Sequence, residues 1–273
     1  MRALLLLSIL LTVTAFAQTD RTYSNGKLAY YGADFYTSNV TKASLYKILS
    51  STHSIVSNQP DSISAACSGQ CFKHTSVGYE GARKIMFGET FMERDGKGTF
   101  VKDVYCGKRF YFNNVNDVSN MHTEVNIEHT WPQSKFSGKF DKNMQKSDMH
   151  HLFPTDSMAN NRRGNHEFGD IANNPDELNV ANCASSKLGH LGGGVIFTPP
   201  VIHRGNVARA LFYFSTRYDI AIDRNQEKIL RQWHKEDPID AAEKSRHEIV
   251  AKYQKVRNPF VDYPELVEKV ADF

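Results

Sequence analysis

Residues 126–165 read NIEHTWPQSKFSGKFDKNMQKSDMHHLFPTDSMANNRRGN, and the expected fold is derived from the pattern of this segment. The segment at residues 124–131 alternates in character and ends before Pro132, which is typical of a short strand. A second short run with apolar flanks, residues 148–153, ends before Pro154. The pattern predicts a strand, a long loop, and then a second strand or extended turn.

A helix is predicted after the second proline. Thr155 or Asp156 can cap its N-terminus, because a short polar side chain there accepts hydrogen bonds from the first free backbone N–H groups. The helix is expected over residues 157–163, and Gly164 ends it.

Three side chains of this stretch have the chemistry of a metal site. Glu128 offers a carboxylate and Asn160 a neutral amide oxygen, and such ligands suit Mg²⁺ or Ca²⁺ better than zinc. A neutral His129 beside the cation can take a proton from water. Because neighbouring strand residues point to opposite faces, we expect a bend or bulge that brings Glu128 and His129 to one site. Taken singly, each residue is better explained as a core histidine, an exposed glutamate or a helix-cap asparagine.

The combination resembles bacterial endonuclease I. The resemblance extends over most of the chain through VNIEH at 125–129 with Pro132, SDMH at 147–150, Asn160 with RGN at 163–165, RGNVARALFYF at 204–214, RNPFVD at 257–262, and residues 79–88 and 101–106. It implies a secreted or periplasmic nuclease built on a ββα-metal finger at about residues 124–166.

The resemblance also implies roles. Glu128 and Asn160 are expected to be metal ligands for Mg²⁺, with Ca²⁺ or Mn²⁺ as alternatives, and His129 is expected to be the general base. The implied reaction is hydrolysis of DNA, with RNA left open as a second substrate, at little sequence specificity and leaving 5′-phosphates. The alternative is a non-catalytic exported nucleic-acid-binding protein, which binds without cleaving.

One departure from the family concerns phosphate binding. Family members with a longer loop after the catalytic histidine place an arginine there, whereas residues 132–147 contain no arginine and have lysines as their only basic residues. A lysine provides a point charge without the two-pronged geometry of arginine. The candidates for substrate binding are Lys135, Lys139, Arg162 and Arg163, and Lys142 and Lys146 are further lysines of the loop.

Other polar residues of the stretch are expected to support the site. Asp148 and His150 lie two positions apart on an extended segment, so both can face one way, and we expect a buried pair rather than direct catalysis. Asn165 and Arg163 either orient the helix or contact the nucleic-acid backbone.

The N-terminus and the cysteines indicate export. Residues 1–17 carry one basic residue, an apolar run too short to span a membrane, and AFA at the end, so we expect a signal peptide cleaved near Ala17. The expected product is a periplasmic or secreted monomer of residues 18–273 without a membrane partner. Export favours disulfides among Cys67, Cys71, Cys106 and Cys183, with the pairing open. A zinc site formed by Cys67, Cys71 and His74 is the rival.

Composition and periodicity define the remaining expectations. The formal net charge is +3, so any nucleic-acid affinity must come from a local patch. Strands are predicted at residues 101–112, turns at 113–120 and 189–194, a loop at 58–69 and an extended tail after Pro259; helical spacing occurs at residues 42–51, 78–88, 206–218, 226–235 and 241–255. We therefore expect an α+β fold: a single domain, helix-rich around a small antiparallel core that carries the ββα-metal finger.

Overall fold

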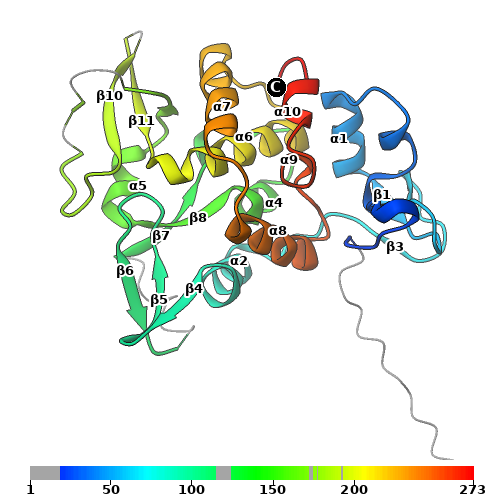
Figure 1. The fold of residues 1–273 in the computed structure, drawn as a ribbon, viewed down its shortest axis with the longest axis horizontal. Helices are drawn as coiled ribbons and strands as arrows, with labels where there is room; N and C mark the ends of the chain where they lie inside the picture. Colours follow the sequence, from blue (N-terminus) through cyan, green and yellow to red (C-terminus); the bar gives the residue numbers. More distant parts are fainter. Residues whose placement is uncertain (1–18, 115–123, 172–174, 177, 192) are drawn as a thin grey trace, which may run out of the picture.

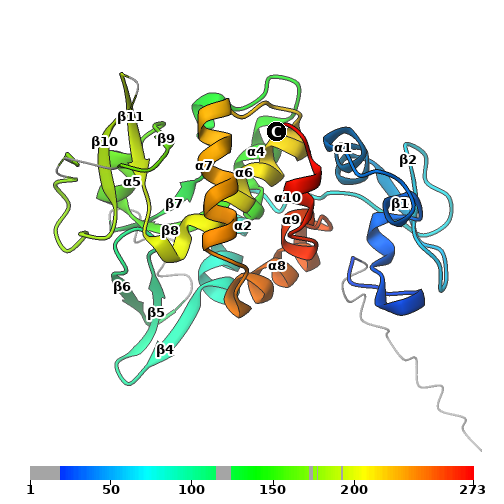
Figure 2. The same ribbon diagram turned by 45° about the horizontal axis from the view of Figure 1, so that its top comes forward.

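The computed structural model describes residues 19–114, 124–171, 175–176, 178–191 and 193–273. The expected signal peptide at residues 1–17 lies outside the described residues, as does most of the turn expected at 113–120. Helices α6 and α7 lie side by side in the middle of the molecule (Figures 1 and 2). On one side of them lie α1 and the first small sheet, and on the other lie α5 and the β10–β11 hairpin.

The helices are mostly short. Their bounds are α1 (Lys42–Ser50), α2 (Tyr79–Ile85), α4 (Lys142–Ser147), α5 (Ser157–Arg163), α6 (Arg204–Tyr218), α7 (Arg224–Glu236), α8 (Ala241–Gln254), α9 (Pro259–Asp262) and α10 (Leu266–Lys269). Shorter helical turns include η4 (Met86–Thr90), η5 (Gln133–Lys135), η6 (Met149–His151) and η7 (Val201–His203).

The strands form small separate sheets. Their bounds are β1 (Thr52–Ser54), β2 (Ser62–Ser64), β3 (Cys71–Phe72), β4 (Met92–Asp95), β5 (Gly98–Lys102), β6 (Arg109–Phe112), β7 (Val125–His129), β8 (Leu152–Asp156), β9 (Glu167–Phe168), β10 (Lys187–Leu191) and β11 (Gly194–Thr198). The sheet orders are β2-β1-β3, β4-β5-β6, β10-β11-β9 and β7-β8. All neighbouring strands in these sheets are antiparallel except β11 and β9. Helices with small, mainly antiparallel sheets agree with the predicted α+β class.

Helix α6 is the centre of the main core. Almost all of its residues are buried, including the polar Arg209, Ser215 and Arg217, so the helix runs through the interior of the protein. Phe214 of α6 stacks on Trp131, with ring centroids 5.2 Å apart, so the helix packs directly against the chain that follows β7. The main core therefore packs against the chain segment that carries the predicted site.

The predicted helices are confirmed, with ends shifted by a few residues, whereas three predicted irregular segments are wrong in whole or in part. The turn expected at residues 189–194 overlaps the end of β10 and the start of β11, which pair with each other. The loop at residues 58–69 contains β2, which pairs with β1. The tail is not extended: Asn258 caps α9 by accepting a hydrogen bond from the Phe260 N–H, and Pro259 occupies the first turn. A proline is favourable there because its missing N–H has no partner in a first helical turn.

Two disulfides join Cys67 to Cys71 and Cys106 to Cys183, with Cα–Cα distances of 5.9 and 4.2 Å. This confirms the expectation of disulfides and decides the pairing. The zinc alternative is wrong, because the sulfur atoms of Cys67 and Cys71 are bonded to each other and are not available as thiolate ligands. Within the described residues, no helix combines the length and apolar character needed to span a bilayer.

Candidate active site

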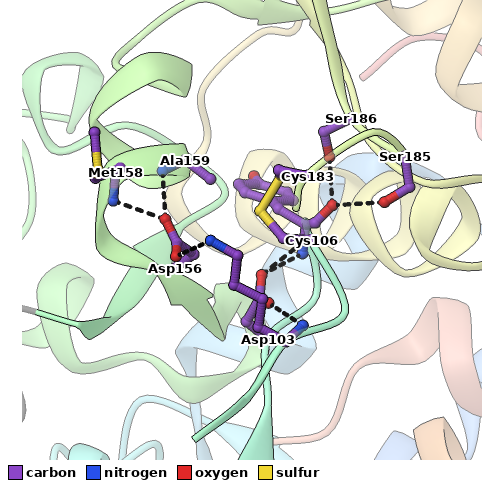
Figure 3. Close-up of a disulfide and its surroundings, with 10 residues drawn as sticks. Asp103, Cys106, Asp156, Met158, Ala159, Cys183, Ser185 and Ser186 are labelled. Atoms are coloured by element: carbon purple, nitrogen blue, oxygen red, sulfur yellow. Dashed lines mark hydrogen bonds and ion pairs between the residues drawn. A yellow bond between two sulfur atoms is a disulfide. The ribbon is translucent and has the colours of Figure 1, made fainter. Parts of the chain in front are cut away.

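The site is built on β7, β8 and α5. The two strands pair residue to residue, from Val125 opposite Asp156 to His129 opposite Leu152, so the expected bulge is absent from this register. Asp156, rather than Thr155, caps α5 by accepting hydrogen bonds from the Met158 and Ala159 N–H groups (Figure 3). The helix thus begins directly where β8 ends, and it lies against the hairpin.

Glu128 lies in the interior with one carboxylate oxygen occupied. Its Oε1 accepts a hydrogen bond of 2.9 Å from the Tyr105 hydroxyl and lies 3.0 Å from Nη1 of Arg163. Burial raises the pKa of Glu128, while Arg163 and the Tyr105 hydrogen bond oppose the rise. Among the described residues, Oε2 has no hydrogen-bond partner.

Asn160 approaches the same strand from α5. Its Nδ2 donates to the Ile127 carbonyl at 3.2 Å, next to Glu128 in the chain, and Oδ1 has no partner among the described residues. Asn160 is partly exposed, whereas Glu128 is 1% exposed. One carboxylate oxygen and one amide oxygen, neither with a hydrogen-bond partner among the described residues, fit a hard divalent cation.

His129 is held in one tautomer. Its Nε2 lies 3.0 Å from the Lys146 carbonyl, and because a carbonyl only accepts, Nε2 carries the hydrogen and Nδ1 is the basic nitrogen. Gln133 Nε2 lies 3.4 Å from Nδ1, and the Tyr79 ring stacks on the imidazole with centroids 5.7 Å apart. Burial, together with nearby positive charge, lowers the pKa of His129 to about 4. The imidazole is therefore neutral at neutral pH, with a lower pKa than its sequence alone suggests.

The two arginines expected near the substrate have different environments. Arg163 is 2 % exposed, pairs with Glu128, and donates to the carbonyls of His129 and Thr130 at 3.0 and 2.6 Å. Its guanidinium is thus committed to the interior of the site rather than to the surface. Arg162 is exposed, and Asn165 Nδ2 lies 3.4 Å from Ser134 Oγ in the loop after β7.

Among the loop lysines, the structure brings Lys146 to His129. The Lys146 ammonium lies 4.4 Å from the centroid of the Tyr79 ring, which in turn stacks on the imidazole. Lys135 and Lys139 each lie near a surface carboxylate, Glu167 at 3.2 Å and Asp219 at 3.5 Å respectively. Lys142 is exposed at the start of α4.

Asp148 and His150 are both buried, but their side chains have separate partners. Asp148 Oδ2 accepts hydrogen bonds of 2.9 Å from the hydroxyls of Tyr213 and Tyr218, and Oδ1 accepts one from the His150 backbone N–H. His150 Nε2 lies 3.0 Å from the Val256 carbonyl. Both residues therefore attach the segment before β8 to the core, in place of the direct side-chain pair that we expected.

Sequence reasoning missed the two groups that hold Glu128. Arg163 was considered only as a helix-orienting residue or a phosphate contact, and Tyr105 was not singled out within the segment at residues 101–106. No spacing rule connects a turn residue before β6 with a strand residue in β7. Only the folded chain brings the hydroxyl and the carboxylate together.

Comparison with known proteins identifies a family that covers most of the chain. The family model described as Endonuclease I matches residues 37–265, which include β7, β8 and α5. This chain belongs to the Endonuclease I family.

Relatives of this Endonuclease I family member carry nuclease names. An extracellular ribonuclease of Bacillus subtilis (strain 168) is 32% identical over 164 residues, covering 53% of this chain and 53% of that protein. An extracellular deoxyribonuclease of Aeromonas hydrophila is 30% identical over 135 residues, covering 48% and 58%. A periplasmic deoxyribonuclease of Aeromonas hydrophila is 28% identical over 120 residues, covering 44% and 49%. The chain spans about half the length of these curated relatives.

Proposed function

We propose that this protein is an exported endonuclease that hydrolyses phosphodiester bonds of DNA, and of RNA as a second substrate, with little sequence preference. The observation that carries the proposal is that Glu128 Oε2 and Asn160 Oδ1 have no hydrogen-bond partner among the described residues, while His129, the next residue after Glu128, is held in one tautomer. The names of the relatives, which include ribonucleases and deoxyribonucleases, support it. In this proposal, residues 18–273 form the nuclease domain that remains after the signal peptide is removed.

Glu128 and Asn160 are the proposed ligands of Mg²⁺, with Mn²⁺ or Ca²⁺ as alternatives, and they make β7, β8 and α5 a ββα-metal finger. When bound, such a cation polarises a phosphate oxygen and stabilises the charge that develops as the bond breaks. Arg163 and Tyr105 hold the opposite carboxylate oxygen, which orients Glu128 and opposes the rise in pKa that burial causes.

His129 is the proposed general base. With Nε2–H donating to the Lys146 carbonyl, Nδ1 carries the lone pair that can take a proton from the attacking water, in place of its 3.4 Å contact with Gln133 Nε2. The lowered pKa keeps the imidazole unprotonated at neutral pH, so the base is always available there. Cleavage is expected to leave a 5′-phosphate.

Lys146 is the proposed cation that replaces the family's arginine. Its ammonium lies beside the ring stacked on His129 and has no carboxylate within ion-pair distance among the described residues. A lysine acts there as a point charge on a phosphate oxygen. Lys135, Lys139 and Arg162, which are exposed, are proposed contacts for the more distant nucleic-acid backbone. Contacts of this kind position the duplex without reading its sequence.

The test is cleavage of plasmid DNA by the purified protein with Mg²⁺ and with EDTA, beside Glu128→Ala and His129→Ala. Both variants should lose roughly 10²–10⁴-fold in rate. The matched control is His190→Ala, because His190 is an exposed histidine on β10, near Asp176 and apart from the finger. Lys146→Ala should slow cleavage more than Lys139→Ala does.

The outcomes separate the classes of protein. Cleavage that needs a divalent cation, Glu128 and His129 supports the proposal, and replacing the plasmid by single-stranded RNA tests the second substrate. Binding of DNA without cleavage under Mg²⁺, Mn²⁺ and Ca²⁺ contradicts it and assigns the protein to the binding class. Near-normal turnover by His129→Ala removes that residue from the role of base.

A further inference from the structure

The turn between β5 and β6, residues 103–108, contacts all three elements of the finger. The Tyr105 hydroxyl donates to Glu128 on β7, at 2.9 Å. The Val104 N–H donates to the Pro154 carbonyl on β8, also at 2.9 Å. The Lys108 ammonium donates to Asp156, the cap of α5, at 2.8 Å. One short segment therefore connects the strands and the helix.

Hydrogen bonds within the turn define its shape. Asp103 accepts from the N–H groups of Tyr105 and Cys106 with Oδ1, and from the Lys108 N–H with Oδ2, at distances between 2.7 and 3.0 Å (Figure 3). A buried carboxylate that accepts several backbone hydrogen bonds orders the residues around it. The position of Tyr105 along the chain is thereby determined locally.

The segment before β10 holds the turn from the other side. The hydroxyls of Ser185 and Ser186 both donate to the Tyr105 carbonyl, at 3.0 and 2.7 Å, and the Cys106–Cys183 disulfide joins the same two segments (Figure 3). The Tyr105 ring is fully buried and packs on Phe197, with centroids 4.7 Å apart. The hydroxyl therefore has little freedom to leave Glu128.

This anchoring determines how Glu128 presents its two oxygens. Both donors to Glu128 among the described residues, the Tyr105 hydroxyl and the Arg163 guanidinium, approach Oε1, and Oε2 has no hydrogen-bond partner among them. Hydrogen bonds to a buried charged group are stronger than those between neutral groups. If one donor is removed, the carboxylate gains rotational freedom and Oε2 is no longer held in a single direction.

We propose that Tyr105 is a positioning residue for the cation site: its hydroxyl fixes Oε1 of Glu128, so that Oε2 is presented to a divalent cation. The inference rests on the proposed function, in which Glu128 is a metal ligand. Removing a side chain that hydrogen-bonds to a metal ligand typically weakens metal affinity by about 10–100-fold. Tyr105 itself touches neither the cation nor the nucleic acid in this role.

The test is the affinity of the full, exported protein for Mn²⁺ alone, measured by titration calorimetry without nucleic acid. Tyr105→Phe removes only the hydroxyl and should raise the Kd for Mn²⁺ by about 10–100-fold. The Mg²⁺ concentration for half-maximal cleavage should rise in parallel, while kcat at saturating Mg²⁺ changes much less. The increase in Tm that Mn²⁺ causes in the wild type should shrink in the variant, and this readout remains usable if the variant is less stable.

The matched control is Tyr218→Phe. The Tyr218 hydroxyl is equally buried and also donates to a buried carboxylate at 2.9 Å, but that carboxylate is Asp148. The control should lose stability and keep the Mn²⁺ affinity of the wild type.

Three results contradict the inference in different ways. Wild-type Mn²⁺ affinity in folded Tyr105→Phe leaves Tyr105 a purely structural residue. Equal weakening in both variants indicates a general loosening of the fold rather than positioning of Glu128. A wild type that binds no Mn²⁺ overturns the proposed metal site itself, and is thereby distinguished from a failure of Tyr105 alone.

Discussion

Replacing Arg163 by methionine should destabilise the protein, because this side chain supports the candidate site from the interior. The guanidinium pairs with Glu128, donates to the carbonyls of His129 and Thr130, and lies 4.4 Å from the Phe168 ring centroid. Methionine keeps much of the apolar volume and removes the charge and all donors. Glu128 is then left buried with only the Tyr105 hydroxyl as a described partner.

The expected loss in the free energy of unfolding is about 3–5 kcal/mol, the usual cost of removing one partner of a buried ion pair. Chemical denaturation at pH 7 measures it. The control is Arg162→Met at the neighbouring, exposed position, which should change stability by no more than about 0.5 kcal/mol. The two variants have the same chemistry, and they differ only in which face of α5 carries the change.

The pH dependence of the stability deficit tests whether the unpaired Glu128 carboxylate causes it. The pKa of Glu128 is already raised by burial, and without Arg163 it should rise further. A folded-state pKa above the unfolded value means that deprotonation destabilises the protein, so the deficit of Arg163→Met should be greatest at neutral pH and should narrow as the pH falls toward the unfolded pKa. Adding Glu128→Gln should restore part of the loss. A deficit below about 1 kcal/mol at pH 7, or one that is independent of pH and of Glu128→Gln, refutes the reasoning.

Three further predictions concern other parts of the molecule. Burial alone would raise the pKa of Asp262, but His247 and the hydrogen bonds from Arg257 lower it well below its ordinary value, so Asp262 contributes stability that is lost as the pH falls through the depressed pKa. The Tm, measured from pH 7 down to about 2, should therefore fall more steeply for the wild type than for Asp262→Asn. Parallel Tm curves for the two proteins would contradict this. Cleavage should persist as the pH falls through about 6.5, the ordinary histidine pKa, and decline near the pKa of about 4 expected for His129, provided that the protein stays folded; an inflection at 6.5 would argue against the buried base. Loss of the Cys106–Cys183 disulfide, which spans 77 residues, should lower the free energy of unfolding by about 4 kcal/mol, and loss of Cys67–Cys71, which spans 4, should lower it by about 2 kcal/mol. Chemical denaturation of the serine variants measures both values, and equal losses would contradict the dependence on loop length.

Much of the local structure was predictable from the sequence, because it depends on neighbours in the chain. The apolar spacing of α6 and the capping residues Asp156 and Gly164 of α5 act within a few residues of where they stand. The tail was predicted wrongly because Pro259 and Pro264 indicate extended chain, whereas Asn258 caps a short helix there. Propensity could not foresee this helix, since its buried side chains are stabilised by contacts with distant parts of the core.

The candidate site shows the same difference between features that depend on neighbours in the chain and features that depend on distant contacts. Glu128, His129 and Asn160 were identified by their spacing within one stretch, because their chemistry and their short separation are visible in the sequence. The partners of Glu128 were not identified, because Tyr105 and Arg163 reach it from a turn and a helix that only the folded chain places together. The groups that can bind a cation and accept a proton were therefore predictable from the sequence. Four other features follow from packing: which carboxylate oxygen lacks a partner among the described residues, which tautomer His129 adopts, which lysine lies near it and how the cysteines pair. Each of these depends on atoms that packing, rather than chain order, brings together.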